Sequence, residues 1–155
     1  MRGEKLFNFL KENHIDYSLV THSPSFTSQI TAHRAHIPGK EFAKPVIVKI
    51  NGKLTMVVVT ANQRVNLTLL KNAFNSNDVK IADETDLMDV FSDCELGAMP
   101  PFGNLYGMDE IISEELTKDE KIYFNAGTHT QLVKMDLNDF ISLVKPRIFN
   151  FKLSM

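Results

Sequence analysis

The chain has little of several features that would point directly to a function. It has one cysteine, Cys94, which excludes an internal disulfide framework and a CxxC zinc pair. No segment approaches the ~20 apolar residues of a membrane span, and the N-terminal segment becomes charged again at Lys11 and Glu12, unlike a signal peptide. A P-loop and a GxGxxG motif are also missing. We therefore expect a single cytoplasmic domain over residues 1–155, with no membrane partner, no cofactor and no metal.

The chain also lacks an excess of basic residues. Lys and Arg number 17 against 19 Asp and Glu, a net charge of −2, which does not favour a dedicated nucleic-acid binder. The charges are unevenly placed, however. Between residues 33 and 64 the basic side chains accompany a single acid, Glu41, while acids gather in 83–95 and 109–120. A basic face that binds a polyanion weakly is compatible with this distribution.

Hydrophobic periodicity and turn signals predict an α+β fold with a mixed sheet. Two β-branched runs, 43–50 and 54–60, flank Asn51-Gly52, a strong hairpin signal, and the second run is apolar enough to be buried on both faces. Further strands are expected at 17–22, 79–82, 110–113, 121–125, 131–135 and 147–153. Helices are expected at 3–14, 29–36, 65–74, 83–91 and 136–145.

Two features do not fit an ordinary structural role. The segment Gly97–Gly103 (GAMPPFG) combines flexible glycines with two prolines, which predicts a stiff loop. Its N–H groups, those of Ala98, Met99, Phe102 and Gly103, could point at a ligand. Lys44 lies inside an apolar strand. Backbone donors and one cation would suit an ester, carboxylate or phosphate. A plain proline turn and a lysine that extends its ammonium to solvent are the alternative.

Other candidates for chemistry are weaker. Cys94 has no base linked to it by sequence and is expected to be a small buried residue. His33 and His36 have spacing that could touch a metal, but no third ligand accompanies them. His129 stands where a strand should end in a turn, which suits either a site residue or a hydrogen-bonded turn histidine. With no side-chain nucleophile, hydrolysis of an activated ester would require mainly a positioned water and a stabilised oxyanion.

At these residues the chain resembles the YbaK-type aminoacyl-tRNA deacylases, which are related to the editing domain of bacterial prolyl-tRNA synthetases. The resemblance covers about residues 5–145. It runs through residues 27–39 (TSQITAHRAHIPG), Ala43-Lys44, the Asn-Gly hairpin, the Gly97–Gly103 loop and residues 124–129 (FNAGTH). It implies an α+β fold with a partly barrel-like sheet and flanking helices. It also implies a stand-alone hydrolase that cleaves the ester of a tRNA mischarged with a small amino acid, without a metal or a covalent intermediate.

The resemblance also assigns expected roles to individual residues. Lys44, Gly97 and His129 would form the catalytic group, with the lysine holding the tRNA 3′ end or the aminoacyl group. The substrate-binding residues would be Thr31, His33, Ala98, Met99, Pro100, Pro101, Phe102 and Gly103. The hypothetical phosphate contacts are Arg34, Lys40 and Lys49. Pro45, where many relatives have a hydroxyl or small residue, could shift substrate preference.

Two alternatives stay open at this point. A non-catalytic module of the same fold could bind tRNA or an aminoacyl-tRNA synthetase, which is the further candidate partner. A hydrolase of small esters or amides unrelated to tRNA is the other. Four apolar residues are candidate pocket walls, although core packing is their usual role: Ile47, Val58, Met99 and Phe102.

Overall fold

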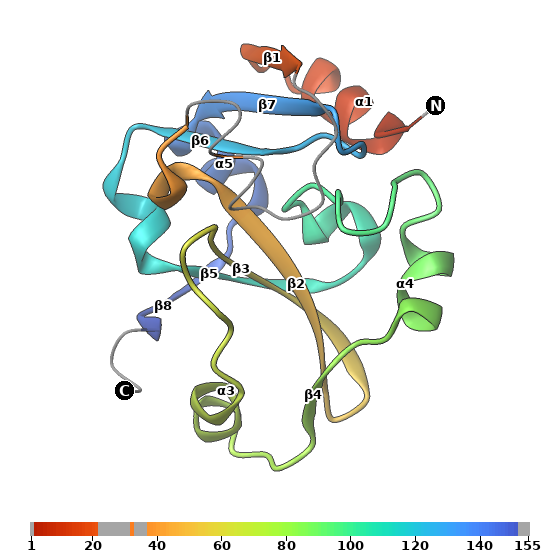
Figure 1. Ribbon diagram of the computed structural model, residues 1–155, viewed down its shortest axis with the longest axis vertical. Helices are drawn as coiled ribbons and strands as arrows, with labels where there is room; N and C mark the ends of the chain where they lie inside the picture. The colour runs from red at the N-terminus through yellow and green to blue at the C-terminus, as the bar shows by residue number, and fades with distance from the viewer. Residues whose placement is uncertain (1, 22–31, 33–36, 152–155) are drawn as a thin grey trace.

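The computed structural model describes residues 2–21, 32 and 37–151, which form two β-sheets with helices around them (Figure 1). The larger sheet has the order β4-β2-β3-β5-β8 and the smaller one β1-β7-β6. The strands are β1 Tyr17–Thr21, β2 Ala43–Ile50, β3 Lys53–Thr60, β4 Val79–Ile81, β5 Asp109–Ser113, β6 Lys121–Asn125, β7 Gln131–Asp136 and β8 Arg147–Phe149. The helices are α1 Glu4–Glu12, α3 Leu67–Ala73, α4 Glu84–Val90 and α5 Leu137–Val144, with 3-10 turns η1 Gly39–Glu41, η2 Gly103–Tyr106 and η3 Glu114–Lys118.

The β2–β3 hairpin is the centre of the larger sheet. Asn51 and Gly52 both have positive φ, 53° and 82°, which is the geometry of a two-residue type I′ turn. The turn sets the register, with Ile50 opposite Lys53 and Lys44 opposite Val59. Because β3 lies between β2 and β5, residues 55–60 are buried, as the sequence predicts.

Two parallel pairings complete this sheet. β5 runs parallel to β3 and β8 runs parallel to β5. Parallel neighbours require long connections, and the connection from β3 to β5 contains α3, β4, α4 and the Gly97–Gly103 loop. The loop is therefore brought back to the sheet that carries Lys44.

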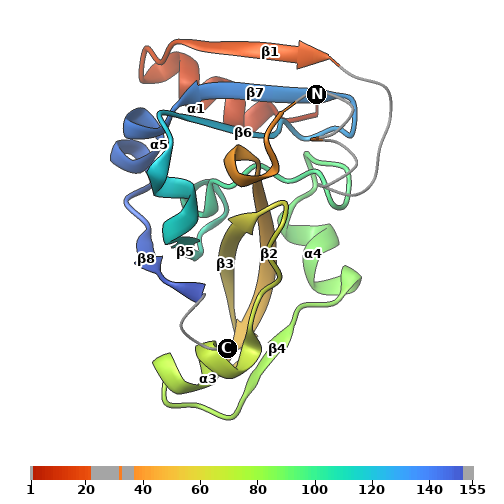
Figure 2. The same ribbon diagram turned by 60° about the vertical axis from the view of Figure 1, so that its left-hand side comes forward.

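The main core lies between the two sheets. It joins α1, the Ala43 and Ile47 face of β2, strands β6 and β7, and α5. Phe102 from the loop packs at its centre, with its ring 5.4 Å from that of Phe124 and 5.3 Å from that of Phe140. A second cluster covers the other face of the larger sheet and includes Leu70 of α3. In both views the three-stranded sheet lies at one end of the molecule and α3 at the other (Figures 1 and 2).

The α+β class and nearly all the expected elements are confirmed, with ends shifted by one or two residues. Two details differ. The described strands form two sheets that do not close into a barrel, and the last strand ends at Phe149 instead of residue 153. The expected helix 29–36 falls almost wholly outside the described residues. None of the described helices is long and apolar enough to cross a membrane.

Candidate functional site

Lys44 is held at the N-terminal end of β2. Its Nζ donates a hydrogen bond to the main-chain oxygen of Gln63 at 2.7 Å, and the side chain is partly buried. The next residue, Pro45, has no N–H. β4 pairs with β2 only at residues 48–50, so the proline lies beyond the stretch where both edges of β2 are paired. Pro45 is therefore compatible with the strand and leaves Lys44 extended, as the sequence predicts.

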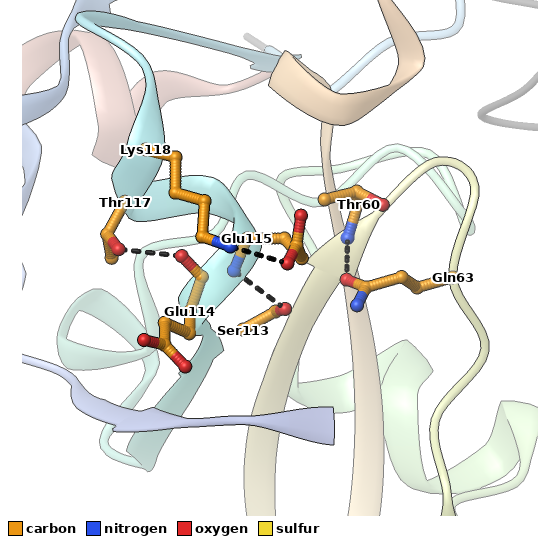
Figure 3. A network of polar contacts seen from close by, with 7 residues as sticks. All are labelled: Thr60, Gln63, Ser113, Glu114, Glu115, Thr117 and Lys118. Carbon is orange, nitrogen blue, oxygen red and sulfur yellow. Dashed lines mark hydrogen bonds and ion pairs between the residues drawn. The ribbon is translucent and has the colours of Figure 1, made fainter. Parts of the chain in front are cut away.

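The acceptor of Lys44 belongs to a tight turn after β3. The Gln63 N–H donates to the Thr60 carbonyl at 3.0 Å, and the Gln63 side chain accepts from the Thr60 N–H at 3.1 Å (Figure 3). The neighbouring Asn62 packs so closely against Gly39 that a Cβ there would lie 2.5 Å from its side-chain oxygen. Two sets of contacts therefore fix the carbonyl that positions the ammonium.

The electrostatic setting of Lys44 favours an anion. Burial lowers the pKa of its ammonium, and the positive charge of Arg64 lowers it further. Within the described ranges, neither Lys44 nor Arg64 takes part in an ion pair. We call these two residues and Gln63 the lysine group. A phosphate or carboxylate placed beside them would compensate both charges.

A second group forms where the Gly97–Gly103 loop meets the turn between β6 and β7. The Glu95 N–H donates to the Gly127 carbonyl at 2.8 Å, and the Gly127 N–H donates to the Ala98 carbonyl at 2.9 Å. His129 Nε2 lies 2.8 Å from the Leu96 carbonyl. Because a carbonyl oxygen only accepts, this nitrogen carries the hydrogen. Three hydrogen bonds thus join the turn to the loop and to the two residues that precede it, Glu95 and Leu96.

Glycine is required on both sides of this junction. Gly97 has a φ of +84°, and a Cβ there would lie 3.3 Å from His129 Cε1. Gly127 has a φ of +93°, and its Cβ would lie 2.7 Å from the Gly3 nitrogen. The structure therefore places Gly97 beside the His129 ring, and we call these two residues the loop–histidine pair. His129 itself is buried, whereas Gly97 is exposed.

The rest of the loop is buried in the protein, from Ala98 through Gly103. The expectation that its N–H groups point at a ligand is wrong for three of the four donors. Ala98 donates to the Glu95 carbonyl at 3.0 Å, Phe102 to the Pro100 carbonyl at 2.8 Å, and Gly103 to Glu110 Oε1 at 2.6 Å. The proline-rich sequence folds back on itself and satisfies these donors internally. Only the Met99 N–H lies outside these bonds, so substrate contacts by residues 98–103 stay a prediction.

The four candidate pocket walls are also core residues. Ile47, Val58, Met99 and Phe102 are each at most 4% exposed and belong to the main core cluster. Their usual structural role is therefore the one that the structure supports.

The two described residues that were expected to contact phosphates, Lys40 and Lys49, have partners of their own. Lys40 Nζ lies 3.6 Å from Asp119, and Lys49 Nζ lies 2.8 Å from Asp86. Lys53 is likewise 3.0 Å from Asp109. The acidic segments thus supply counter-charges to the basic stretch, which weakens the expectation of a continuous basic face. Three further candidates, Thr31, His33 and Arg34, lie outside the described residues.

The lysine group and the loop–histidine pair are held in place by different parts of the fold. Successive side chains of β2 point to opposite faces, so Lys44 lies on the same face as Val46 and on the opposite face from Ala43. Met99 of the loop belongs to the core on the Ala43 side. No hydrogen bond or ion pair between described residues joins the two groups. The structure describes each group by itself, and a joint catalytic role of Lys44, Gly97 and His129 stays a prediction.

Glu110 is a residue that the sequence reasoning missed. Its side chain accepts from the Gly103 N–H, and only 7% of the residue is exposed. A signal was present, because Glu110 lies two residues before Ile112 in a predicted strand and would therefore share the face of that buried residue. Burial raises the pKa of its carboxyl to about 8.

Cys94 is buried, as expected, and burial raises the pKa of its thiol to about 12, which leaves it a poor nucleophile. In the described part of the chain, no group of three or more His, Cys, Asp or Glu side chains is placed to hold a metal ion. The pair His33 and His36 lies outside that part.

Comparison with known proteins gives the family. Residues 22–143 match the family model of the aminoacyl-tRNA editing domain. The Escherichia coli (strain K12) protein named multifunctional Ser/Thr-tRNA deacylase ProXp-y is 21% identical over 155 residues, with 96% of this chain and 92% of that protein covered.

Two further matches extend the comparison. A proline–tRNA ligase of Bacillus mycoides (strain KBAB4) is 28% identical over 79 residues, which cover 51% of this chain and 14% of the ligase. The crystal structure of a candidate trans-editing enzyme for prolyl tRNA synthetase superposes with a TM-score of 0.80 at 14% identity, covering 96% of this chain and 94% of that one. The chain therefore belongs to the aminoacyl-tRNA editing domain family.

Proposed function

We propose that this protein is a trans-editing deacylase that hydrolyses the ester between a small amino acid and its tRNA. The observation that carries the proposal is the family match over residues 22–143, which contains Lys44, Gly97 and His129. Water adds to the ester carbonyl, and the bond to the tRNA 3′ oxygen breaks, which gives a free amino acid and a free tRNA hydroxyl. The buried Cys94, with its raised thiol pKa, supports a mechanism without a cysteine nucleophile.

The lysine group supplies the charge in this proposal. Lys44 and Arg64 hold a phosphate at the 3′ end of the tRNA or the carbonyl oxygen of the ester. Their mutual repulsion and the partial burial of Lys44 make an anion favourable there. The Gln63 carbonyl fixes the direction of the ammonium, so little ordering is required when the substrate binds.

The loop–histidine pair supplies shape. Gly97 is the exposed position of the loop, and His129 behind it is fixed by its bond to the Leu96 carbonyl. A wall made of main chain admits a small amino-acid side chain and excludes a large one by steric contact. The name of the E. coli relative makes serine and threonine the first substrates to examine, beside alanine and cysteine.

The first experiment is deacylation of a panel of tRNAs charged with alanine, cysteine, serine or threonine. We expect hydrolysis of at least one of them, and a fall of about 10²-fold or more for Lys44→Ala, the size expected when one electrostatic contact to the transition state is lost. Lys53→Ala is the matched control, because Lys53 is an exposed lysine of the same sheet with an acidic partner. Its rate should stay within about 2-fold of wild type.

The remaining outcomes separate the alternatives. No hydrolysis above the spontaneous rate, with retained tRNA binding, would favour the non-catalytic module. Cleavage of model esters without tRNA binding would favour a small-molecule hydrolase. The likeness of half the chain to part of a proline–tRNA ligase makes such a synthetase the second partner to test.

A further inference from the structure

Glu110 makes a contact that reaches into the Gly97–Gly103 loop. It lies on β5, opposite Met56 of β3, and its Oε1 accepts the Gly103 N–H at 2.6 Å. The second carboxyl oxygen, Oε2, is buried and has no hydrogen-bond partner. A buried carboxyl group is costly. Its one bond goes to the main chain of the loop, so its place in the core has to be explained by that bond.

Gly103 is held from both ends by this arrangement. Its N–H donates to Glu110, and its carbonyl accepts from the Met108 N–H at 3.1 Å. A Cβ at Gly103 would lie 3.1 Å from both Glu110 Oε1 and the Met108 carbonyl. The carboxyl thus occupies the space that a side chain at residue 103 would need, and the fit fixes the C-terminal end of the loop.

The contact is also a fixed point for the loop as a whole. Phe102, next to Gly103, packs against Phe124 and Phe140, and the other end of the loop is bonded to the β6–β7 turn. Gly97 and its contact with His129 therefore lie on a segment that is fixed at one end by Gly127 and at the other by Glu110.

Among the residues that the structure describes, no charged side chain faces the Glu110 carboxyl. Burial is the main influence on its pKa, and the Gly103 N–H opposes it. The ionisable groups on the surrounding elements have other contacts. They are Asp109 with Lys53, Tyr106 with Asp93, Glu115 with Lys118, and Arg147 with the rings of Phe74 and Phe149. Since its pKa is raised to about 8, the group is mostly neutral at pH 7.

We propose that Glu110 is a positioning residue for the editing site, which fixes the Gly97–Gly103 loop through its hydrogen bond to the Gly103 N–H. It acts through the loop and does not touch the substrate. The inference rests on the proposed function for its effect on turnover, but the contact with Gly103 can be tested without it.

The test compares wild type with Glu110→Gln and Glu110→Met. Glutamine keeps an acceptor oxygen in the same place, whereas methionine has a similar length and no strong acceptor. In each protein we would measure hydrogen exchange of the Gly103 amide, and kcat and KM for the best substrate of the tRNA panel. We expect Glu110→Gln to stay within about 3-fold of wild type in both readouts at pH 7. We expect Glu110→Met to raise Gly103 exchange and lower kcat by about 10-fold or more each, with a smaller change in KM.

A pH series tests the burial of the Glu110 carboxyl, on which its contact with Gly103 depends. The carboxyl has a pKa of about 8 in the folded protein and 4.5 as its reference value. The unfolded chain therefore loses this proton first, and rising pH lowers the stability of the wild type between about pH 4.5 and 8. The glutamine of Glu110→Gln does not titrate, so this loss of stability is confined to the wild type. The denaturation midpoint of Glu110→Gln relative to wild type should therefore rise over this window and level off above it.

The outcomes that overturn the proposal are distinct from failure of the proposed function. Equal Gly103 exchange in Glu110→Met and Glu110→Gln would overturn it, and so would equal loss of kcat in both. If wild type hydrolyses no tRNA, the proposed function fails, while Gly103 exchange still decides whether Glu110 holds the loop. If Glu110→Met does not fold, the wild-type Gly103 amide shift must follow the titration of the Glu110 carboxyl carbon, and independence of the two would overturn the contact.

Discussion

Gly97 shows how the site depends on single residues. Its φ of +84° lies in the left-handed region, and the place where its Cβ would stand is next to the His129 ring. The positive φ is a property of the backbone at Gly97 alone, whereas the crowding of a Cβ depends on where His129 lies. Gly52 has nearly the same φ, +82°, and open space around it, so the two effects can be separated.

At the residue scale we predict that Gly97→Ala is more damaging than Gly52→Ala. Both substitutions place a side chain at positive φ, at a cost of about 1–2 kcal/mol in the free energy of unfolding. Only Gly97→Ala also moves His129, so it should lower deacylation by about 10-fold while Gly52→Ala leaves activity unchanged. Urea denaturation and the tRNA assay measure the two effects. Equal activity of the two variants would show that the contact with His129 has no role.

The sequence alone predicts some of the residues of the candidate site. The glycines, the prolines and Lys44 were predicted as a group because their residue types are unusual in a strand and a loop. The partners were not readable, since Gln63, Leu96 and Glu110 come from other segments. A single sequence does not indicate which distant carbonyl or carboxyl group will accept a hydrogen bond from a given donor.

At the scale of elements, the segment between β3 and α3 supports the lysine group. It carries Gln63 and Arg64 and ends at Asn66, whose side chain accepts from the Leu69 N–H at 3.0 Å and caps α3. The cap fixes the far end of the segment, and the turn with Thr60 fixes the near end. The position of the Lys44 acceptor therefore depends on an intact helix start.

We predict that Asn66→Ala lowers the free energy of unfolding by about 1 kcal/mol, because an N-terminal N–H of α3 loses its acceptor. Asn66→Ser, which retains a capping oxygen, should recover most of the loss. Urea denaturation at pH 7 measures both variants. If serine and alanine were equally destabilising, another contact of Asn66 would be responsible instead of the cap.

Elements were the most predictable level. The Asn51-Gly52 turn, the β-branched runs and the periodic helices are local signals, and the structure confirms them. The short β8 shows the limit, because Ile148 is 51% exposed although the apolar sequence continues. Strand length depends on how far the neighbouring strand β5 extends, which local sequence does not contain.

At the scale of the whole molecule, the charges of the basic stretch are balanced across the fold. Lys40, Lys49 and Lys53 each meet an acid from a later segment. Among the described residues of the stretch, Lys44 and Arg64 form no ion pair with an acidic side chain. In the part of this stretch that the structure describes, the uncompensated positive charge is therefore localised at Lys44 and Arg64.

We predict that tRNA binding depends only weakly on salt. Two to three phosphate contacts give a slope of log K against log salt of about −2, compared with a much steeper slope for a broad basic surface. Lys49→Ala should leave affinity nearly unchanged, whereas Asp86→Asn frees Lys49 and should raise affinity at low salt. A filter-binding titration from 50 to 300 mM salt, roughly the range in which such slopes are resolved, measures this. A loss of affinity in Lys49→Ala would show that the lysine contacts phosphate in spite of Asp86.

The sequence by itself determined the local features of this protein: the hairpin, the helices, the stiff loop and the presence of Lys44 and His129 in a recognisable order. These follow from backbone preferences and periodicity, which act between residues close in the chain. Only the tertiary structure decided that β5 and β8 pair in parallel, that acids pair with Lys40, Lys49 and Lys53, and that Glu110 is buried against Gly103. Those outcomes depend on which distant segments become neighbours, and burial then changes the charge state and the free donors of groups whose residue types alone suggest otherwise.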